Sequence, residues 1–97
     1  MKTNLLVFIV TAYCHCAACN GKANQPTASG YYPKEGITVA GPAWLPFHTS
    51  IDIQGIGLRK VQDRMQKRYR NGKYIDIFMS SHTKAKKFGR QKLLVKY

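Results

Sequence analysis

The chain has 97 residues, 44% of them apolar, which is enough for one small core and leaves little material for a second domain. Sixteen Lys and Arg residues against four Asp and Glu give a net charge of +12, which favours a polyanionic partner such as nucleic acid, an anionic membrane surface or the polymers of a bacterial wall. The basic residues are spread from Lys22 to Lys96, and the sequence has no zinc-finger or RNA-binding signature, so we expect no nucleic-acid partner.

An apolar run opens the chain. Residues Leu5 to Val10, which follow Lys2, resemble the start of a secretory signal. Six apolar residues are at or below the usual lower limit for the hydrophobic region of such a signal, and they are far too few for a transmembrane segment. We therefore favour a buried first strand from Leu5 to Tyr13, with a short export signal as the alternative.

Three cysteines follow this strand in a C-x-C-x-x-C pattern, Cys14, Cys16 and Cys19. Thiolates and imidazole are suitable ligands for tetrahedral zinc, and His48 or His82 would supply one from a distance. The second half of a standard zinc motif is missing, so a short disulfide with one remaining thiol and buried thiols are alternatives. We accordingly predict no cofactor, with zinc as the open alternative.

Residues 23–36 are rich in Gly, Pro, Ser, Thr and Asn, which predicts a surface loop or hairpin. Loops of this kind often carry binding residues. In this loop Tyr31 and Tyr32 would stack against a sugar or a base, or would instead cover one end of a barrel.

Two short strands are expected next. Ile37 to Ala40 has the composition of a strand and is followed by a Gly-Pro pair and a loop with the single Trp. Ser50 to Gln54 alternates polar and apolar residues with period two, as a half-buried strand does. Asp52 falls on the polar side, so we expect it to aid solubility, and Gly55 to Leu58 should form a turn.

The stretch from Val61 to Phe78 contains two of the four acidic residues, Asp63 and Asp76, separated by a basic run. Its ends have strand composition, and Asn71-Gly72 is typical of a tight turn, so we expect two strands and a connection that bring both carboxylates to one place. Desolvation in a partly dry cleft would raise the pKa of Asp76 and suit it to donating a proton. Ordinary ion pairing of both aspartates is the alternative.

The last part of the chain predicts a short helix and a final strand. Residues 80–89 have Ser80 or Ser81 as an N-cap and Gly89 as the glycine after the last turn. Lys92 to Tyr97 has strand composition. Five or six short strands with one helical segment predict an all-β protein, a small β-barrel.

Six separated motifs occur in the order found in the 3D domain, a family named for its three aspartates: VTAYCHCAACNGK, PTASG, TVAGPAWLPFHT, DRM, YIDIF and SSHTKAKKFG. The similarity covers roughly residues 9–97, so the whole chain, residues 1–97, is expected to be a single domain of this type. That family is similar to the catalytic barrel of membrane-bound lytic transglycosylase A. The resemblance therefore implies a double-psi β-barrel that cleaves the β-1,4 bond between N-acetylmuramic acid and N-acetylglucosamine in peptidoglycan and leaves a 1,6-anhydro sugar.

The resemblance also implies roles for individual residues. Asp76 matches the aspartate of the family's I-D-[VI]-[FY] motif, which implies a general acid that later acts as base. Asp63 matches the aspartate that begins D-T-G-G, here D-R-M-Q, and implies positioning or electrostatic support. The third aspartate is replaced by Gly41, and Asp52 does not substitute for it by motif. Restoring the acid as Gly41→Asp is expected to raise turnover, provided that Gly41 does not need a positive φ.

Candidate glycan-binding residues lie in or beside these motifs: Lys22, Thr27, Ser29, Tyr31, Lys73, Ser81 and His82. One carboxyl can suffice for this chemistry, because the 6-hydroxyl of the sugar attacks in place of water. We thus expect a monomeric peptidoglycan lytic transglycosylase in the cell envelope, secreted or phage-associated. A non-catalytic wall-binding or virion structural module with the same barrel is the alternative, and a nucleic-acid-binding barrel is a more distant one.

Overall fold

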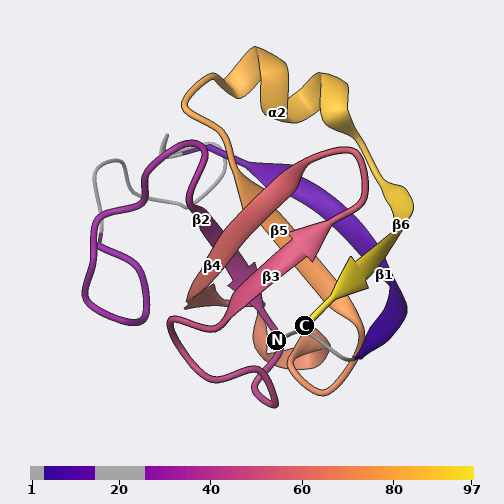
Figure 1. Cartoon of the computed structure of the whole chain (residues 1–97). Coiled ribbons are helices and arrows are strands. Elements are labelled where there is room, and N and C mark those ends of the chain that lie inside the picture. The colour runs from indigo at the N-terminus through magenta and orange to yellow at the C-terminus, as the bar shows by residue number, and fades with distance from the viewer. Residues whose placement is uncertain (1–3, 15–25) are drawn as a thin grey trace.

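Six strands close into a barrel with the order β1-β5-β2-β4-β3-β6 in the computed structural model, which describes residues 4–14 and 26–97 (Figure 1). The elements in chain order are β1 (Leu5–Tyr13), β2 (Thr38–Gly41), β3 (Ser50–Ile53), β4 (Gly57–Arg64), η1 (Lys67–Tyr69, a 3-10 helix), β5 (Tyr74–Phe78), α2 (His82–Phe88, an α-helix) and β6 (Gln91–Lys96). The prediction of a small all-β barrel with one short α-helical segment is confirmed.

Parallel and antiparallel neighbours are mixed around the barrel. β1 runs parallel to β5 and β2 runs parallel to β4, whereas the other four neighbouring pairs are antiparallel. Asn4 and Tyr97 extend the β1–β6 pair by two backbone hydrogen bonds of 3.2 and 3.0 Å. The barrel therefore differs from an up-and-down barrel, in which sequential strands are antiparallel neighbours.

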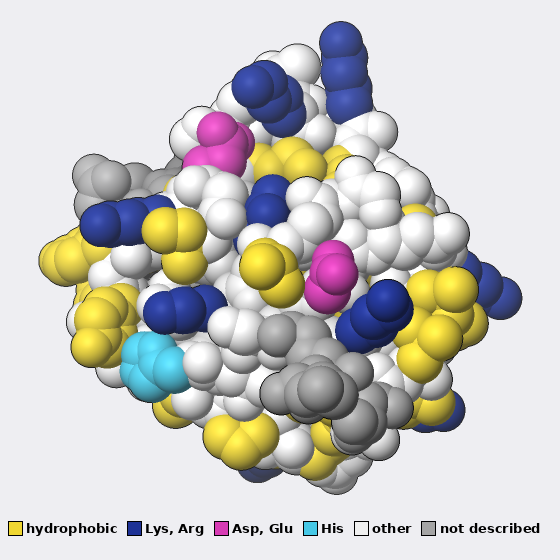
Figure 2. Space-filling model, viewed as in Figure 1, with side chains coloured by type: hydrophobic (Ala, Val, Ile, Leu, Met, Phe, Trp, Pro, Cys, Tyr) yellow, Lys and Arg dark blue, Asp and Glu magenta, His cyan; other side chains and the backbone are white. Residues whose placement is uncertain are grey.

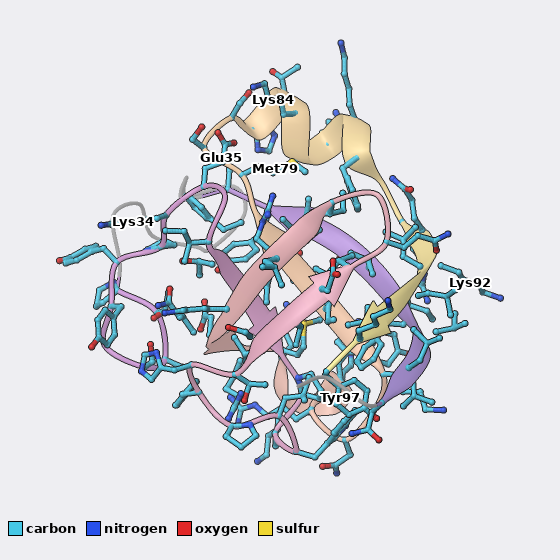
Figure 3. All side chains as sticks on the ribbon, in the orientation of Figure 1. Lys34, Glu35, Met79, Lys84, Lys92 and Tyr97 are labelled. Atoms are coloured by element: carbon cyan, nitrogen blue, oxygen red, sulfur yellow. The ribbon has the colours of Figure 1, made fainter. Side chains whose placement is uncertain are left out.

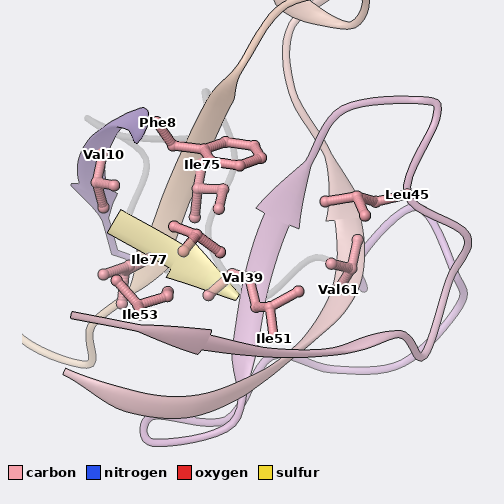
Figure 4. Close-up of a cluster of buried hydrophobic side chains, with 10 residues drawn as sticks. Phe8, Val10, Val39, Leu45, Ile51, Ile53, Val61, Ile75 and Ile77 are labelled. Carbon is pink, nitrogen blue, oxygen red and sulfur yellow. The ribbon is translucent and has the colours of Figure 1, made fainter. Parts of the chain in front are cut away.

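The barrel interior is filled by side chains that alternate along the strands with outward-facing ones. Figure 4 shows these buried side chains. In β5 the two inward residues are Ile75 and Ile77, which are both almost completely buried. Burial of one such side chain stabilises the fold by roughly 1.5–3 kcal/mol. The core contains Phe8, Val10, Val39, Leu45, Ile51, Ile53, Val61, Ile75, Ile77 and Val95. The alternation places Asp76, between the two isoleucines, on the outer face of β5.

The predicted strands agree closely with the observed ones. β1 and the strand Tyr74–Phe78 have the predicted bounds, and the ends of β2, β3 and β6 differ from the predicted ones by at most one residue. β4 differs more, because it begins at Gly57, four residues before the predicted strand composition at Val61. The predicted turn at Gly55 is present, but Gly57 and Leu58 already belong to β4. Gly55 and Gly57 have φ values of 76° and 105°, which glycine adopts without strain.

Helix α2 begins and ends as the sequence predicts. The Ser81 side chain caps the helix and accepts a hydrogen bond of 3.2 Å from the Lys84 amide, and Gly89 follows the last turn with a φ of 68°. Glu35 accepts a hydrogen bond from the Ser80 amide just before the helix, and Figure 3 shows Glu35, Met79 and Lys84 together at this end of the barrel. Within the described residues, no helix has the length and apolarity that crossing a membrane requires.

Candidate active site

Strand β2 brings the two aspartates together. Ala40 is the Cα partner of Asp63 in the parallel pair β2–β4 and of Asp76 in the antiparallel pair β2–β5. β4 and β5 are therefore not neighbours, and the segment with the Asn-Gly turn signal connects strands on either side of β2. The expectation that the two carboxylates lie close together is confirmed, although strand β2 separates the strands that carry them, β4 and β5.

A register shift contributes to this arrangement. Val39 pairs with Val61, but the next residue, Ala40, pairs with Asp63 because the ladder shifts between Val39 and Ala40. An uninterrupted register would have placed Gln62 opposite Ala40. Irregularities of this kind redirect side chains and are common beside active sites.

The two carboxylates line one pocket of about 270 Å³, close to the lower end of the range of roughly 300–1,000 Å³ for small-molecule sites. Its walls come from the end of β1, from β2, from the end of β4 with η1, and from β5. The lining residues are Thr11, Tyr13, Ala40, Asp63, Arg64, Met65, Gln66, Arg68, Tyr69 and Asp76.

Asp76 has the properties of a proton donor. Burial raises the pKa of its carboxyl from 3.8 to about 6, against the lowering effect of a hydrogen bond from Thr11, and the charge of Asp63 raises it further. The Thr11 hydroxyl donates this bond to Oδ1 of Asp76 at 3.0 Å. The predicted upward shift of the pKa is therefore present, and its main cause is the predicted one, desolvation.

Asp63 is held by three hydrogen bonds. Its Oδ1 accepts bonds of 2.9 Å from the amides of Ala28 and Arg64, and its Oδ2 accepts one of 3.2 Å from the Tyr13 hydroxyl. Burial, followed by the negative charge of Asp63, raises the pKa of Tyr13, so this phenol keeps its proton and donates. Asp63 is thus a fixed negative charge beside Asp76.

The ion-pair interpretation of the two aspartates does not hold. All four acidic residues of the chain lie within residues 4–14 and 26–97, and there neither Asp63 nor Asp76 forms a salt bridge with Lys or Arg. Their partners are instead hydroxyl and amide donors. In a protein with a net charge of +12, two pocket carboxylates without a cationic partner are better explained by chemistry than by charge balance.

The loop that carries the PTASG motif lies against Asp63 through the amide of Ala28. Thr27 is buried, and its hydroxyl lies 3.0 Å from that of Ser29, so these two predicted binding residues bond to each other. Tyr31 is 56% exposed, and its ring packs edge-on against His48 with 5.1 Å between centroids. The loop thus borders Asp63 through its backbone.

The other predicted binding residues lie elsewhere. Lys73 borders a separate surface depression beside Tyr74 and Lys92, and Ser81 and His82 are at the start of α2. Lys22 is outside the described residues. None of the six described candidates lines the pocket that holds both aspartates.

The cysteine cluster is described only in part. Cys14 is buried at the end of β1, and its Sγ lies 3.4 Å from Nδ1 of His82. Cys16 and Cys19 lie outside the described residues, so the zinc site and the disulfide both stay predictions. Among the residues that the structure does describe, no three His, Cys, Asp or Glu side chains form a metal-binding group.

Gly41 lies on β2 directly after Ala40 and does not have a positive φ. Its carbonyl accepts a hydrogen bond from the Met65 amide, at 3.2 Å. A Cβ at position 41 would lie 3.0 and 3.3 Å from the two methyl groups of Val61, which is completely buried in the core. The backbone condition for Gly41→Asp is met, but the Val61 side chain would have to move by a few tenths of an ångström to make room for the new Cβ.

Sequence reasoning did not identify Arg64, Arg68 and Tyr69 as pocket residues. The first lies one position after Asp63, where a strand would direct its side chain to the opposite face, and the other two belong to the unpredicted helix η1. The signal available in the sequence was the departure of D-R-M-Q from D-T-G-G.

Comparisons with known proteins give no further assignment, because no protein-family model and no curated protein matches this chain.

Proposed function

We propose that this protein is a peptidoglycan lytic transglycosylase of the 3D-domain type and that Asp76 is its general acid and base. The observation that supports this proposal most strongly is the Asp76 carboxyl, which has a pKa near 6 in a pocket shared with Asp63. A carboxyl with such a pKa is partly protonated near neutral pH, as a general acid must be.

In the proposed reaction, Asp76 first donates its proton to the glycosidic oxygen between N-acetylmuramic acid and N-acetylglucosamine. The bond from C1 of the muramic acid to this oxygen breaks, and the N-acetylglucosamine leaves with a hydroxyl group. The 6-hydroxyl of the same muramic acid attacks C1, and its proton passes to the Asp76 carboxylate. One carboxyl therefore completes a cycle without consuming water, and the acid is regenerated.

Asp63 has a supporting role in this scheme. Its charge favours the protonated form of Asp76 before reaction, and it would stabilise positive charge that develops on the sugar ring during bond cleavage. Three hydrogen bonds hold the carboxylate in place before substrate arrives, so little reorganisation is needed. Such preorganisation is usually a large part of enzymatic rate enhancement.

The surface charge agrees with a wall polymer as partner. Figure 2 shows Lys and Arg side chains distributed over the displayed face, with few acidic side chains between them. The net charge of +12 would attract the carboxylates and phosphates of a bacterial wall at long range. We accordingly propose a protein that acts as a monomer in the cell envelope, secreted or phage-associated.

The experiment that tests the function is incubation of the purified protein with peptidoglycan, followed by mass spectrometry of the released muropeptides. A 1,6-anhydro product, which is 18 Da lighter than the hydrolysis product because one water is not added, is the expected result. The missing third aspartate and the crowded Gly41 favour the second candidate, a wall-binding or virion structural module without catalysis. Folded protein that binds the wall and gives no anhydro product would establish that second function.

A further inference from the structure

Three arginines surround the end of β4 beside the pocket: Arg64, Arg68 and Arg70. Nη1 of Arg64 donates a hydrogen bond of 2.9 Å to the Leu45 carbonyl, and its Cζ lies 4.0 Å from the centre of the Phe47 ring. Nε of Arg70 donates one of 3.0 Å to the Met65 carbonyl. Two of the three guanidinium groups are therefore anchored to the backbone, unlike the long side chains of an ordinary solvated surface.

The third arginine, Arg68, shares the solvent exposure of Arg70. Arg68 belongs to η1 and is exposed, and its Cζ lies 4.7 Å from the centre of the Tyr69 ring. Arg64 and Arg68 both line the pocket that holds Asp63 and Asp76. The pocket thus combines two acidic groups with two guanidinium groups.

Within the part of the chain that the structure describes, none of these three arginines forms a salt bridge. The four acidic residues are all described, and none forms a salt bridge with Arg64, Arg68 or Arg70. Burial lowers the pKa of Arg64, the neighbouring charge of Arg70 lowers it further, and Asp63 acts in the opposite direction. The charges of Arg64 and Arg70 therefore repel each other, and an anion bound beside Arg64 would offset this repulsion.

We propose that Arg64 and Arg68 bind a carboxylate of the glycan while Asp76 contacts the glycosidic oxygen, an inference that rests on the proposed function. Guanidinium groups match carboxylates in shape and form paired, charge-assisted hydrogen bonds with them. N-acetylmuramic acid carries a lactyl group, which ends in a free carboxylate when the stem peptide is absent. When the peptide is present, its own carboxylates supply the same chemistry.

The arrangement would couple binding to protonation. A carboxylate held by the arginines adds a negative charge to the pocket of Asp76, which favours the protonated form of this acid. The substrate would thereby help to keep the proton that the first step uses.

The test compares three glycans: peptide-free strands of alternating N-acetylglucosamine and N-acetylmuramic acid, the same strands with stem peptides, and chitohexaose, which has no carboxylate. Each is titrated calorimetrically and assayed for anhydro products, with wild type, Arg68→Gln and Arg64→Lys. Arg90→Gln is the matched control, because Arg90 is exposed after α2 and does not line the pocket.

Arg68→Gln should weaken binding of the carboxylated strands about 10- to 100-fold, the value of a charge-assisted hydrogen bond, and leave chitohexaose binding unchanged. Arg64→Lys keeps the charge but loses the paired hydrogen-bond geometry. We expect it to weaken binding of the carboxylated strands less than Arg68→Gln does, and again to leave chitohexaose binding unchanged. A loss confined to peptide-free strands identifies the lactyl carboxylate, and one confined to peptide-bearing strands identifies the peptide.

Equal effects of Arg68→Gln on all three glycans, or no effect on any, would overturn the inference. The proposed function fails separately: Arg68-dependent binding of carboxylated strands without anhydro product from wild type would retain the anion site and reject the transglycosylase. Anhydro product formed equally well by wild type and Arg68→Gln would support the transglycosylase and reject the anion site.

Discussion

Thr11 and Asp76 are Cα partners in the parallel pair β1–β5, and the threonine hydroxyl donates a hydrogen bond of 3.0 Å to Oδ1 of the aspartate. This bond stabilises the ionised carboxylate and opposes the effect of burial. We predict that Thr11→Val, which has nearly the same shape, raises the pKa of Asp76 above about 6. An NMR titration of the aspartate carboxyl carbons measures the change. Thr11→Ser is the control because it keeps the hydroxyl, and an equal or lower pKa in the valine variant would contradict the prediction.

Asp76→Asn should abolish the proposed wall-cleaving activity while the fold is kept. The amide has the shape of the carboxyl but neither gives nor takes the proton, and loss of a general acid costs roughly 10²- to 10⁴-fold in rate. Anhydro muropeptide release measures activity, and the melting temperature reports the fold. Asp52→Asn is a suitable control, since Asp52 lies on β3 and does not line the pocket. Unchanged turnover in Asp76→Asn would remove Asp76 from the mechanism.

The raised pKa of Asp76 also predicts how stability depends on pH. Near pH 2 this group is protonated in both the folded and the unfolded chain, so it has no effect on their balance. As the pH rises from about 4 to 6, the unfolded chain releases the proton and the folded one retains it, so the contribution of Asp76 to stability falls and then levels off. Relative to wild type, Asp76→Asn should therefore become more stable by about 2 kcal/mol between pH 4 and pH 7. Urea unfolding of both proteins across this range measures the difference, and a difference that stays constant with pH would refute the assignment.

Tyr13→Phe should loosen Asp63 without displacing Asp76. The variant removes one of the three hydrogen bonds to the Asp63 carboxylate, and a hydrogen bond to a charged group contributes about 1.5–3 kcal/mol. We expect a loss of stability of about this size, with a decrease in turnover if Asp63 supports the reaction. Tyr97→Phe is the control and should change neither stability nor turnover, because Tyr97 does not line the pocket. Equal stability of Tyr13→Phe and wild type would show that the bond is unimportant.

Gly41→Asp should destabilise the protein, whatever its effect on turnover. Its Cβ would approach the Val61 methyl groups to 3.0 and 3.3 Å, and overpacking of a core costs about 1–3 kcal/mol. In a Val61→Ala background those methyl groups are absent, so the cost of Gly41→Asp should decrease by about 1 kcal/mol or more. A double-mutant cycle measured by urea unfolding gives this coupling, and additive effects would contradict the steric explanation.

Local signals in the sequence predicted much of the fold. The first strand, the YIDIF strand and the capped helix α2 are determined by apolar composition, β-branching and capping residues within a few positions, which a sequence displays directly. Asp63 and Asp76 were also identified from the sequence. The insertion of β2 between their strands was not predicted, because pairing between distant segments leaves no local pattern. Arg64 and Arg68 were missed for the same reason, since the direction of a side chain depends on where the strand ends and on the register it adopts.

The position of β1 has a consequence for synthesis of the protein. Its two neighbours, β5 and β6, are the last two of the six barrel strands in chain order. Backbone hydrogen bonds between Asn4 and Tyr97 extend the pair that β1 forms with β6. During translation the first strand therefore leaves the ribosome long before either partner exists, with both edges open to other chains. Contacts so distant in sequence slow folding, and transiently exposed strand edges promote aggregation. Barrel closure therefore has to wait until β6 has been made, and a nascent chain stalled before β6 would lack the strand that seals β1.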